Sequence, residues 1–246
     1  MFSIFKTYFI DPVLPPRCPV SGDIVQENAF ISPESWARLR FITYPFCESC
    51  GIPFGHTAEP SAPNCAGLLC LTCLSYPPQF DTARAPLVYN DDSRKIVLAF
   101  KYGDQQQCAL TMTRFMARCV SDPARYDAVI PVPLHRGRLI RRRFNQSAVL
   151  ARHIGRMLHI PYRPDYLVRT RATPQQKQKN YKQRRKNVRS AFAVPDLRST
   201  EIKNAQLLLI DDVFSTGATV NECSKTLKKE GAERIDVLTF AQTVKD

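Results

Sequence analysis

The sequence lacks any uninterrupted apolar run of the roughly 18 residues that a membrane-spanning helix requires. Its apolar start is interrupted by Lys6 and ended by Asp11-Pro12, so neither a signal peptide nor a membrane span is expected. Disordered and collagen-like classes are excluded as well, because 44% of the 246 residues are hydrophobic and only 9 are Gly. We therefore expect a globular protein of the cytoplasm.

Cysteine is too scarce for a disulfide scaffold, with 9 residues in a chain of 28.0 kDa. The number is also odd, so the cysteines cannot all pair within one chain. In a reducing compartment, clustered cysteines more often bind a metal ion, and the spacing of these cysteines decides whether they do.

Acidic residues are almost missing between Arg136 and Arg189, where 17 Lys and Arg stand against the single acid Asp165. Such a stretch is either a solvated basic face or a surface for phosphate-rich ligands, a pyrophosphate-bearing small molecule or a nucleic acid. The aromatic residues of the stretch are also few: Phe144, Tyr162, Tyr166 and Tyr181. A platform for stacking bases is therefore not plainly indicated.

The composition and the hydrophobic pattern of the chain change near residue 85. Residues 1–80 are rich in Pro and Cys and lack a long periodic pattern. This is typical of a small module that depends on a metal ion or on cross-links for its stability. The later part predicts strands at 85–90, 127–132, 207–213 and 235–241, helices at 93–102, 104–120, 145–158 and 217–231, and a loop at 173–189. Strands alternating with helices predict an α/β domain at 85–246 with a mainly parallel sheet.

Two C-x2-C pairs form the cysteine cluster. Cys47 and Cys50 are separated from Cys70 and Cys73 by 19 residues, a spacing typical of a zinc ribbon. Four thiolates complete the tetrahedron of a structural Zn²⁺ and leave no position for a catalytic water. Four unrelated core cysteines and a redox pair are weaker alternatives, and Cys65 stays open as a rival ligand.

A second motif begins where the apolar run 207–210 ends in Asp211 and Asp212. A short turn then opens a helix, and its residues are Ser215, Thr216, Gly217, Ala218 and Thr219. Backbone N–H groups at a helix N-terminus suit a phosphate, and adjacent carboxylates accept hydrogen bonds from vicinal hydroxyls and help to hold a divalent cation. The segment therefore predicts a sugar-phosphate site, with simple N-capping or a metal-only site as alternatives.

This motif resembles the 5-phosphoribosyl-1-pyrophosphate (PRPP) motif of type I phosphoribosyltransferases, with Phe214 bulkier than the aliphatic residue expected there. Further segments extend the resemblance to the competence protein F (ComF) family: 131–135, 142–146 and 169–173, with Gln176, Arg184, Asn187 and Phe192. The resemblance implies a type I phosphoribosyltransferase fold, a parallel sheet flanked by helices, behind an N-terminal zinc-ribbon module. It also implies PRPP with Mg²⁺ as ligand and a link to DNA uptake.

Two departures from the family pattern bear on function. Arg143 stands where the family usually has Gly, which makes that turn bulkier and more basic. The four cysteines expected of a first ribbon are represented by Cys18, Ser21, Ser32 and Ser35. A serine hydroxyl does not replace a thiolate on zinc, so we expect one metal site rather than two.

The resemblance also places residues near the pyrophosphate and in a flexible hood at 173–189 that would close over the site. These residues are Lys101, Pro133, Arg142, Arg143, Asn145, Gln146, Arg169, Arg171, Gln176 and Arg184. No general base is identified, since His135 is a candidate by position alone and an exposed loop histidine is the simpler interpretation.

Two functions follow as hypotheses. The first is a phosphoribosyltransferase that binds PRPP and Mg²⁺ and transfers the phosphoribosyl group to an unknown acceptor. The second is a non-catalytic protein of the same fold that binds single-stranded DNA through the basic stretch 136–189, or that meets a DNA-uptake or processing protein.

Overall fold

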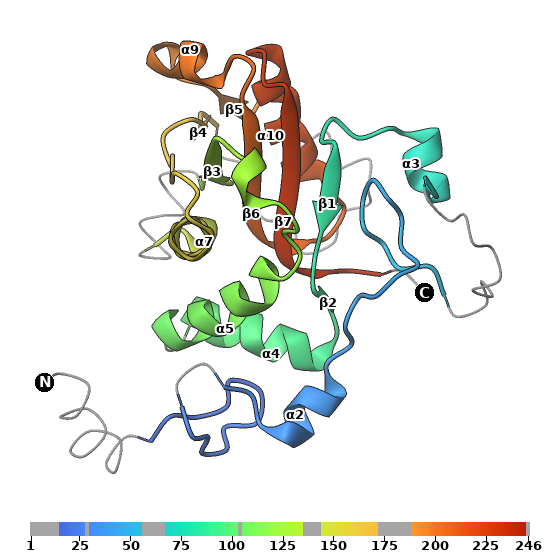
Figure 1. Ribbon diagram of the computed structural model, residues 1–246, viewed down its shortest axis with the longest axis vertical. Helices are drawn as coiled ribbons and strands as arrows, with labels where there is room; N and C mark the ends of the chain where they lie inside the picture. Colours follow the sequence, from blue (N-terminus) through green and yellow to red (C-terminus); the bar gives the residue numbers. More distant parts are fainter. Residues whose placement is uncertain are drawn as a thin grey trace, which may run out of the picture.

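The computed structural model describes residues 15–27, 30–55, 67–102, 105–134, 144–171 and 188–244. A five-stranded parallel sheet forms the centre of the molecule (Figure 1). Its strands are β1 (Thr82–Arg84), β2 (Leu87–Val88), β3 (Ala128–Pro131), β6 (Gln206–Phe214) and β7 (Arg234–Gln242). The order is β1-β7-β6-β3, and β2 also pairs with β7. A parallel sheet of this kind confirms the predicted α/β class.

Strand β6 reaches further than its neighbour β3. The register runs from Ala128 opposite Leu207 to Pro131 opposite Ile210, where β3 ends. On the other side β6 stays paired with β7 as far as Phe214. The residues that follow Ile210 therefore emerge at the carboxyl edge of the sheet, which is where ligands bind in open α/β sheets.

The sheet separates two apolar cores, because successive side chains of a strand point to opposite faces. Leu207 and Leu209 pack with α10 (Ala218–Lys229) on one face. Leu208 and Ile210 pack on the other face. The helices there are α4 (Asp91–Tyr102), α5 (Gln105–Ala117) and α7 (Gln146–Leu158) (Figure 1).

The helix α7 lies so close to β3 that only glycine fits at one position. A Cβ atom added to Gly155 would lie 2.8 Å from the carbonyl oxygen of Ile160 and 2.9 Å from Cγ1 of Val129. The amino end of the same helix is capped by Asn145, whose side chain accepts a hydrogen bond from the backbone N–H of Ser147. Asn145 also donates from Nδ2 to the carbonyl oxygen of Val132, just after β3, so the first turn of α7 lies beside the carboxyl edge of the sheet.

Most of the predicted elements are present with shifted ends. The predicted helix 217–231 is α10, which begins at Ala218 and is followed by Gly231 in a left-handed conformation (φ +90°). The predicted strand 85–90 is wrong as one element, because the chain forms β1 and β2 on either side of a break. Tertiary pairing with β7 selects these short strands, and local sequence patterns do not report such pairing.

Several short elements were not predicted. They are α2 (Pro33–Arg38), α3 (Leu71–Ser75), η2 (Pro123–Arg125), η3 (Asp196–Arg198) and α9 (Ser199–Ile202), with the antiparallel pair β4 (Val168–Arg169) and β5 (Phe192–Ala193). Elements of two to six residues carry too few periods to be recognised. Residues 173–187 of the predicted loop 173–189 lie outside the described residues.

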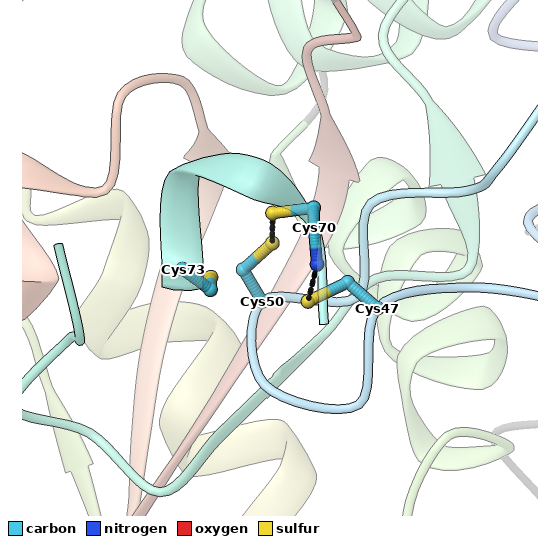
Figure 2. A group of neighbouring side chains, drawn as sticks. All are labelled: Cys47, Cys50, Cys70 and Cys73. Carbon is cyan, nitrogen blue, oxygen red and sulfur yellow. Dashed lines mark hydrogen bonds between the residues drawn. The ribbon is translucent and has the colours of Figure 1, made fainter. Parts of the chain in front are cut away.

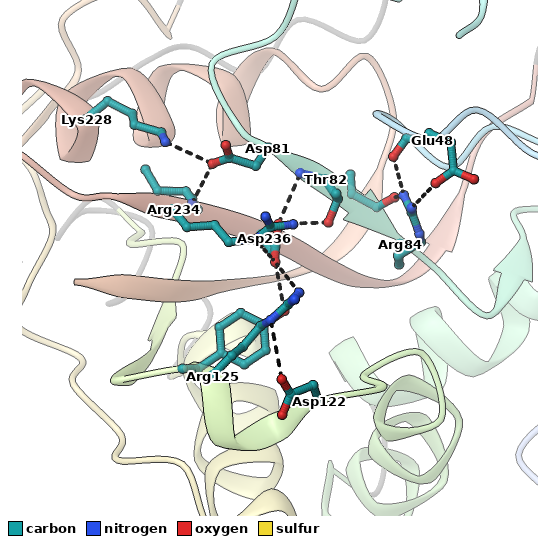
Figure 3. Close-up of polar contacts among 12 residues, drawn as sticks. Glu48, Asp81, Thr82, Arg84, Asp122, Arg125, Lys228, Arg234 and Asp236 are labelled. Atoms are coloured by element: carbon teal, nitrogen blue, oxygen red, sulfur yellow. Dashed lines mark hydrogen bonds and ion pairs between the residues drawn. The ribbon is translucent and has the colours of Figure 1, made fainter. Parts of the chain in front are cut away.

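A buried carboxylate organises the amino end of the sheet (Figure 3). Asp236 of β7 is 3% exposed and accepts hydrogen bonds from Thr82 (2.8 Å), Tyr126 (2.9 Å) and Arg234 (2.8 Å). Burial alone would raise the pKa of Asp236, but the hydrogen bonds from Arg234, Thr82 and Tyr126 outweigh it and hold this pKa below its usual value. The network ties β1, β7 and η2 together far from the carboxyl edge.

The two parts of the N-terminal module pack on opposite faces of the sheet. Cys18 and Leu39 belong to the core beside α4 and α5, whereas Cys47 and Cys73 belong to the core beside α10. In the part of the chain that the structure describes, no helix has the length and apolar character to cross a lipid bilayer.

Candidate functional site

Two carboxylates stand at the carboxyl edge of the sheet, near the end of β6. Asp211 Oδ1 accepts hydrogen bonds from Ser147 Oγ (2.8 Å) and from the backbone N–H of Asp212 (2.9 Å). The Asp212 carboxylate forms an ion pair with Lys101, at 2.7 Å between Nζ and Oδ2. The last turn of α4 and the first turn of α7 therefore meet the end of β6 at one place.

The electrostatics of this pair favour a positively charged ligand. Burial raises the pKa of Asp211 to about 7, and the neighbouring charge of Asp212 adds to the increase. The hydrogen bond from Ser147 and the charge of Lys101 act in the opposite direction without cancelling it. A divalent cation would restore full ionisation of Asp211, and carboxylate oxygens are ligands that Mg²⁺ accepts.

A tight turn connects these acids to α10. Gly217 has φ +68°, a conformation that favours glycine, and a Cβ atom there would lie 2.6 Å from Cζ of Phe214. The bulky Phe214 ring therefore fills the space beneath the turn and packs edge to face on Phe80, with centroids 6.0 Å apart. Helix α10 starts at Ala218, so the turn presents a helix N-terminus with its positive potential.

The end of β7 supports the turn from behind. Thr243 Oγ1 donates a hydrogen bond to the carbonyl oxygen of Ser215 (2.9 Å), and the backbone N–H of Thr243 donates to the carbonyl oxygen of Phe214 (2.9 Å). The preceding residue, Gln242, is 2% exposed and donates from Nε2 to the carbonyl oxygen of Cys50 (3.0 Å). Two consecutive residues thus join the turn to the cysteine module.

Figure 2 shows the four cysteine side chains of this module converging on one point. The sulfur atoms of Cys47, Cys50, Cys70 and Cys73 all lie within 4.8 Å of one another. A ZnS₄ tetrahedron with bonds of about 2.3 Å has sulfur atoms about 3.8 Å apart. The sulfur atoms of Cys50 and Cys70 are 3.7 Å apart, so the donor set fits a structural zinc ion.

The first cysteine pair rests directly on the sheet. Gly51 has φ +72°, and a Cβ atom there would lie 2.4 Å from the carbonyl oxygen of Ala83 in β1. The backbone N–H of Ala83 in turn donates to the carbonyl oxygen of Ser49 (2.6 Å). The metal module is therefore joined to the sheet, and Cys65, the rival ligand, lies outside the described residues.

The remnant of the first ribbon is a hydrogen-bonded cluster. The backbone N–H of Ser32 donates to Cys18 Sγ (3.4 Å), and Ser32 Oγ lies 3.3 Å from Ser21 Oγ. Ser32 Oγ also donates to Ser35 Oγ (2.9 Å), and Ser35 is fully buried. The four positions therefore still lie together, and hydrogen bonds connect them.

The predicted pyrophosphate and hood residues fall into three groups. Asn145 donates from Nδ2 to the carbonyl oxygen of Val132 (3.1 Å), which places Pro133 and the buried Gln146 at the carboxyl edge with the acids. Arg169 lies over the Phe192 ring at 5.2 Å in the β4–β5 pair, and Arg171 extends from the same pair. Apart from Lys101, which pairs with Asp212, the others lie outside the described residues: Arg142, Arg143, Gln176 and Arg184, with His135.

Two residues of this arrangement were not predicted. Ser147 follows the Asn145-Gln146 pair directly, so its position beside the motif was the available signal. Thr243 carries no signal in the sequence, because only the pairing of β6 with β7 brings it to the turn. Whether the predicted site residues bind a ligand stays a prediction.

Known proteins resemble this chain over most of its length. A family profile described as "Double zinc ribbon domain" matches residues 9–74. "Competence protein F" of Haemophilus influenzae is 31% identical over 214 residues, which cover 85% of this chain and 89% of that protein. The chain belongs to the competence protein F family. This family assignment confirms the resemblance stated from the sequence.

Other relatives are less similar to this chain. "DNA utilization protein YhgH" of Escherichia coli O157:H7 is 28% identical over 80% of this chain and 84% of that protein. "Competence protein ComFC" of Bacillus subtilis is 25% identical over 79% of this chain and 76% of that protein. The predicted α/β class is confirmed, with a parallel sheet flanked by helices and an N-terminal zinc-ribbon module.

Solved structures match about half of this chain at low similarity. The "Glutamine phosphoribosylpyrophosphate (PRPP) amidotransferase from B. subtilis complexed with ADP and GMP" is 17% identical, with a TM-score of 0.35, and the match covers 51% of this chain and 24% of that one. The "purine phosphoribosyltransferase from Pyrococcus horikoshii Ot3" is 15% identical, with a TM-score of 0.33 over 55% of this chain and 80% of that one.

Proposed function

We propose that this family member binds PRPP with Mg²⁺ and transfers the phosphoribosyl group to an acceptor. The observation that carries the proposal is the arrangement at the end of β6, where Asp211 and Asp212 meet Lys101 and Ser147 directly before the turn that opens α10. A carboxylate pair, a cation and a helix N-terminus in this order match a ribose, a pyrophosphate and a 5′-phosphate.

In the proposed complex, the carboxylates of Asp211 and Asp212 accept hydrogen bonds from the ribose hydroxyls. Mg²⁺ would supply charge neutralisation for the pyrophosphate when bound there. The turn 215–219 donates its backbone N–H groups to the 5′-phosphate. Lys101 exchanges its ion pair with Asp212 for the pyrophosphate, because the incoming ligand competes for both partners.

The transfer itself breaks the bond between ribose C1 and the pyrophosphate oxygen and forms a bond from C1 to the acceptor nucleophile. The pyrophosphate leaves with the electron pair of the broken bond, and cationic side chains stabilise the charge that develops on it. The predicted pyrophosphate and hood residues would serve this step, and the hood at 173–189 would exclude water. The proposed division of the chain into a ribbon module at 1–80 and a transferase domain at 85–246 assigns these roles to the second part.

Calorimetric titration of the zinc-loaded protein with PRPP and Mg²⁺ tests the proposal. The wild-type protein should give a saturable heat, and the double variant Asp211→Asn/Asp212→Asn should give none. Asp196→Asn is the matched control, because Asp196 is an exposed acid at η3 and should leave the titration unchanged. An absence of heat with wild type, or an unchanged titration of the double variant, would refute the proposed site.

A second candidate function rests on a different observation. The stretch 136–189 holds 17 basic residues and one acid, and relatives carry the names competence protein and DNA utilization protein. Single-stranded DNA binding by this stretch predicts that Arg141→Ala/Arg142→Ala/Arg143→Ala weakens the binding of an oligonucleotide and flattens its salt dependence. Equal salt slopes for the variant and the wild type would contradict this function.

A further inference from the structure

A cavity of about 600 Å³ lies between the zinc-ribbon module and the turn that opens α10. The ribbon side of the cavity includes Cys50, Cys73 and helix α3. Residues 214–218 and Asn221 line the opposite side. We call this cavity the ribbon pocket, and its volume lies in the range of small-ligand sites, about 300–1000 Å³.

Among the described residues, no basic side chain lines the ribbon pocket, although the protein carries a formal net charge of +13. The charge in its wall is negative, because Cys50, Cys70 and Cys73 are thiolates when they hold zinc. None of the described residues that line it is Lys, Arg, His, Asp or Glu. A phosphate or carboxylate inside the pocket would therefore lose its hydration without gaining an ionic partner. The interior suits a neutral group, while the backbone of the turn 215–218 offers N–H groups at its border.

Apolar side chains make up much of the pocket wall. Phe80 and Phe214 meet at an interplanar angle of 85°, so the two rings present surfaces of different orientation. Leu71 and Tyr76 of the ribbon line the pocket and are 83% and 60% exposed, so a ligand can reach their apolar surface. Aromatic and aliphatic walls of this kind bind a planar ring through stacking and apolar burial.

A few polar groups could orient a ring in this pocket. Asn221 accepts a hydrogen bond from the backbone N–H of Gln79 through Oδ1 (2.7 Å), which fixes the amide and leaves Nδ2 as the donor for a ligand. Thr72 and Ser75 add hydroxyl groups from the exposed side of α3. Mostly apolar walls with a few fixed polar groups are typical of sites for heteroaromatic rings.

We propose that the ribbon pocket binds the neutral heteroaromatic ring of a nucleotide whose 5′-phosphate lies on the turn 215–219. The phosphate part of this inference rests on the proposed function, and the ring part names the substrate class that the proposed function leaves open. The zinc ribbon then forms one wall of a binding site, in addition to stabilising the fold. Asp211 and Asp212 do not line the pocket, so the two sites can be perturbed separately.

The experiment measures the binding of the four common ribonucleoside 5′-monophosphates, their nucleosides and ribose 5-phosphate to the zinc-loaded protein. At least one monophosphate should bind about tenfold more tightly than ribose 5-phosphate, because stacking of its base adds binding free energy that ribose 5-phosphate lacks. If no monophosphate binds more tightly than ribose 5-phosphate, the ribbon pocket does not accept the ring.

Filling the ribbon pocket should remove this advantage. Thr72→Trp places a bulky ring in the pocket from the exposed side of α3 and does not change the turn, so monophosphate binding should fall about tenfold while ribose 5-phosphate binding stays the same. Leu74→Trp is the matched control, because Leu74 is 59% exposed on the same helix and does not line the pocket. Ser75→Trp repeats the test if Thr72→Trp lowers the zinc content.

The outcomes separate the pocket from the proposed function. One outcome is that the protein gives no heat with PRPP but binds a nucleoside, and that Thr72→Trp abolishes this binding. This result supports the pocket and refutes the PRPP site. The opposite outcome is that PRPP binding depends on Asp211 and Asp212, while neither Thr72→Trp nor Ser75→Trp affects monophosphate binding. This result supports the PRPP site and refutes the pocket.

Discussion

Replacing Asp211 by Asn should stabilise the unliganded protein. Asn keeps an Oδ1 atom that can accept the hydrogen bonds from Ser147 and from the backbone N–H of Asp212, so the substitution mainly removes a charge. The pKa of Asp211 is raised to about 7 by burial and by the neighbouring Asp212. The folded state therefore binds this proton more tightly than the unfolded state does.

The sign and the size of the effect follow from these two pKa values. A carboxyl group whose pKa is higher in the folded state than in the unfolded state lowers stability progressively as the pH rises from the unfolded value toward the folded value. With 3.8 and about 7 as these values, the ionised Asp211 lowers the free energy of unfolding by about 3 kcal/mol at pH 6 and about 4 kcal/mol at pH 8. Asp211→Asn should remove up to this amount of destabilisation.

Urea unfolding of the zinc-loaded protein at pH 6 and pH 8, without Mg²⁺ or phosphate, measures the difference. The zinc content has to be equal in both buffers, because thiolate ligands are protonated at low pH. Asp236→Asn is a control of opposite sign, since the lowered pKa of Asp236 stabilises the fold above the unfolded pKa and this stabilisation is lost as the pH falls through the folded pKa. If the Asp211→Asn variant has a lower free energy of unfolding than wild type at pH 8, the reasoning is refuted.

Three further substitutions test the supports of the site. Cys73→Ser should lower the zinc content measured by a chromogenic chelator and reduce the free energy of unfolding by several kcal/mol, because the tetrahedral set loses a thiolate. Gly217→Ala should weaken PRPP binding in the calorimeter at least about tenfold, and adding Phe214→Leu should restore part of it by making room for the new Cβ. Gly155→Ala should destabilise the protein by about 1–3 kcal/mol in urea unfolding, because its Cβ would meet the backbone of Ile160, and an unchanged midpoint would show that α7 moves freely away from β3.

Much of the fold could be predicted because its signals are local. The run 207–210 is apolar on both faces, as a central parallel strand must be, and it is buried in β6. The helix beginning after Gly217 was predicted within two residues at each end, since its glycines mark both termini. The spacing of the two C-x2-C pairs indicated a metal site, because that chemistry depends on residue type and short-range geometry.

Other features depend on contacts that span long stretches of chain. Lys101 was predicted as an additional pyrophosphate contact, but only the packing of α4 beside β6 brings its ammonium group to Asp212. Ser147 and Thr243 reach the site in the same way, from α7 and from the end of β7. Short strands such as β2 exist because a neighbouring strand pairs with them, and no local pattern encodes that partner.

The sequence by itself determined the family, the α/β class, the cysteine cluster and the acids that precede a glycine turn, since each depends on residue types at short spacings. The tertiary structure alone decided which cation faces Asp212, why the pKa of Asp211 is raised by burial, and that the ribbon and the turn line one pocket. Burial, electrostatic interaction and enclosure arise between segments that are distant in the chain, so only the folded chain sets them.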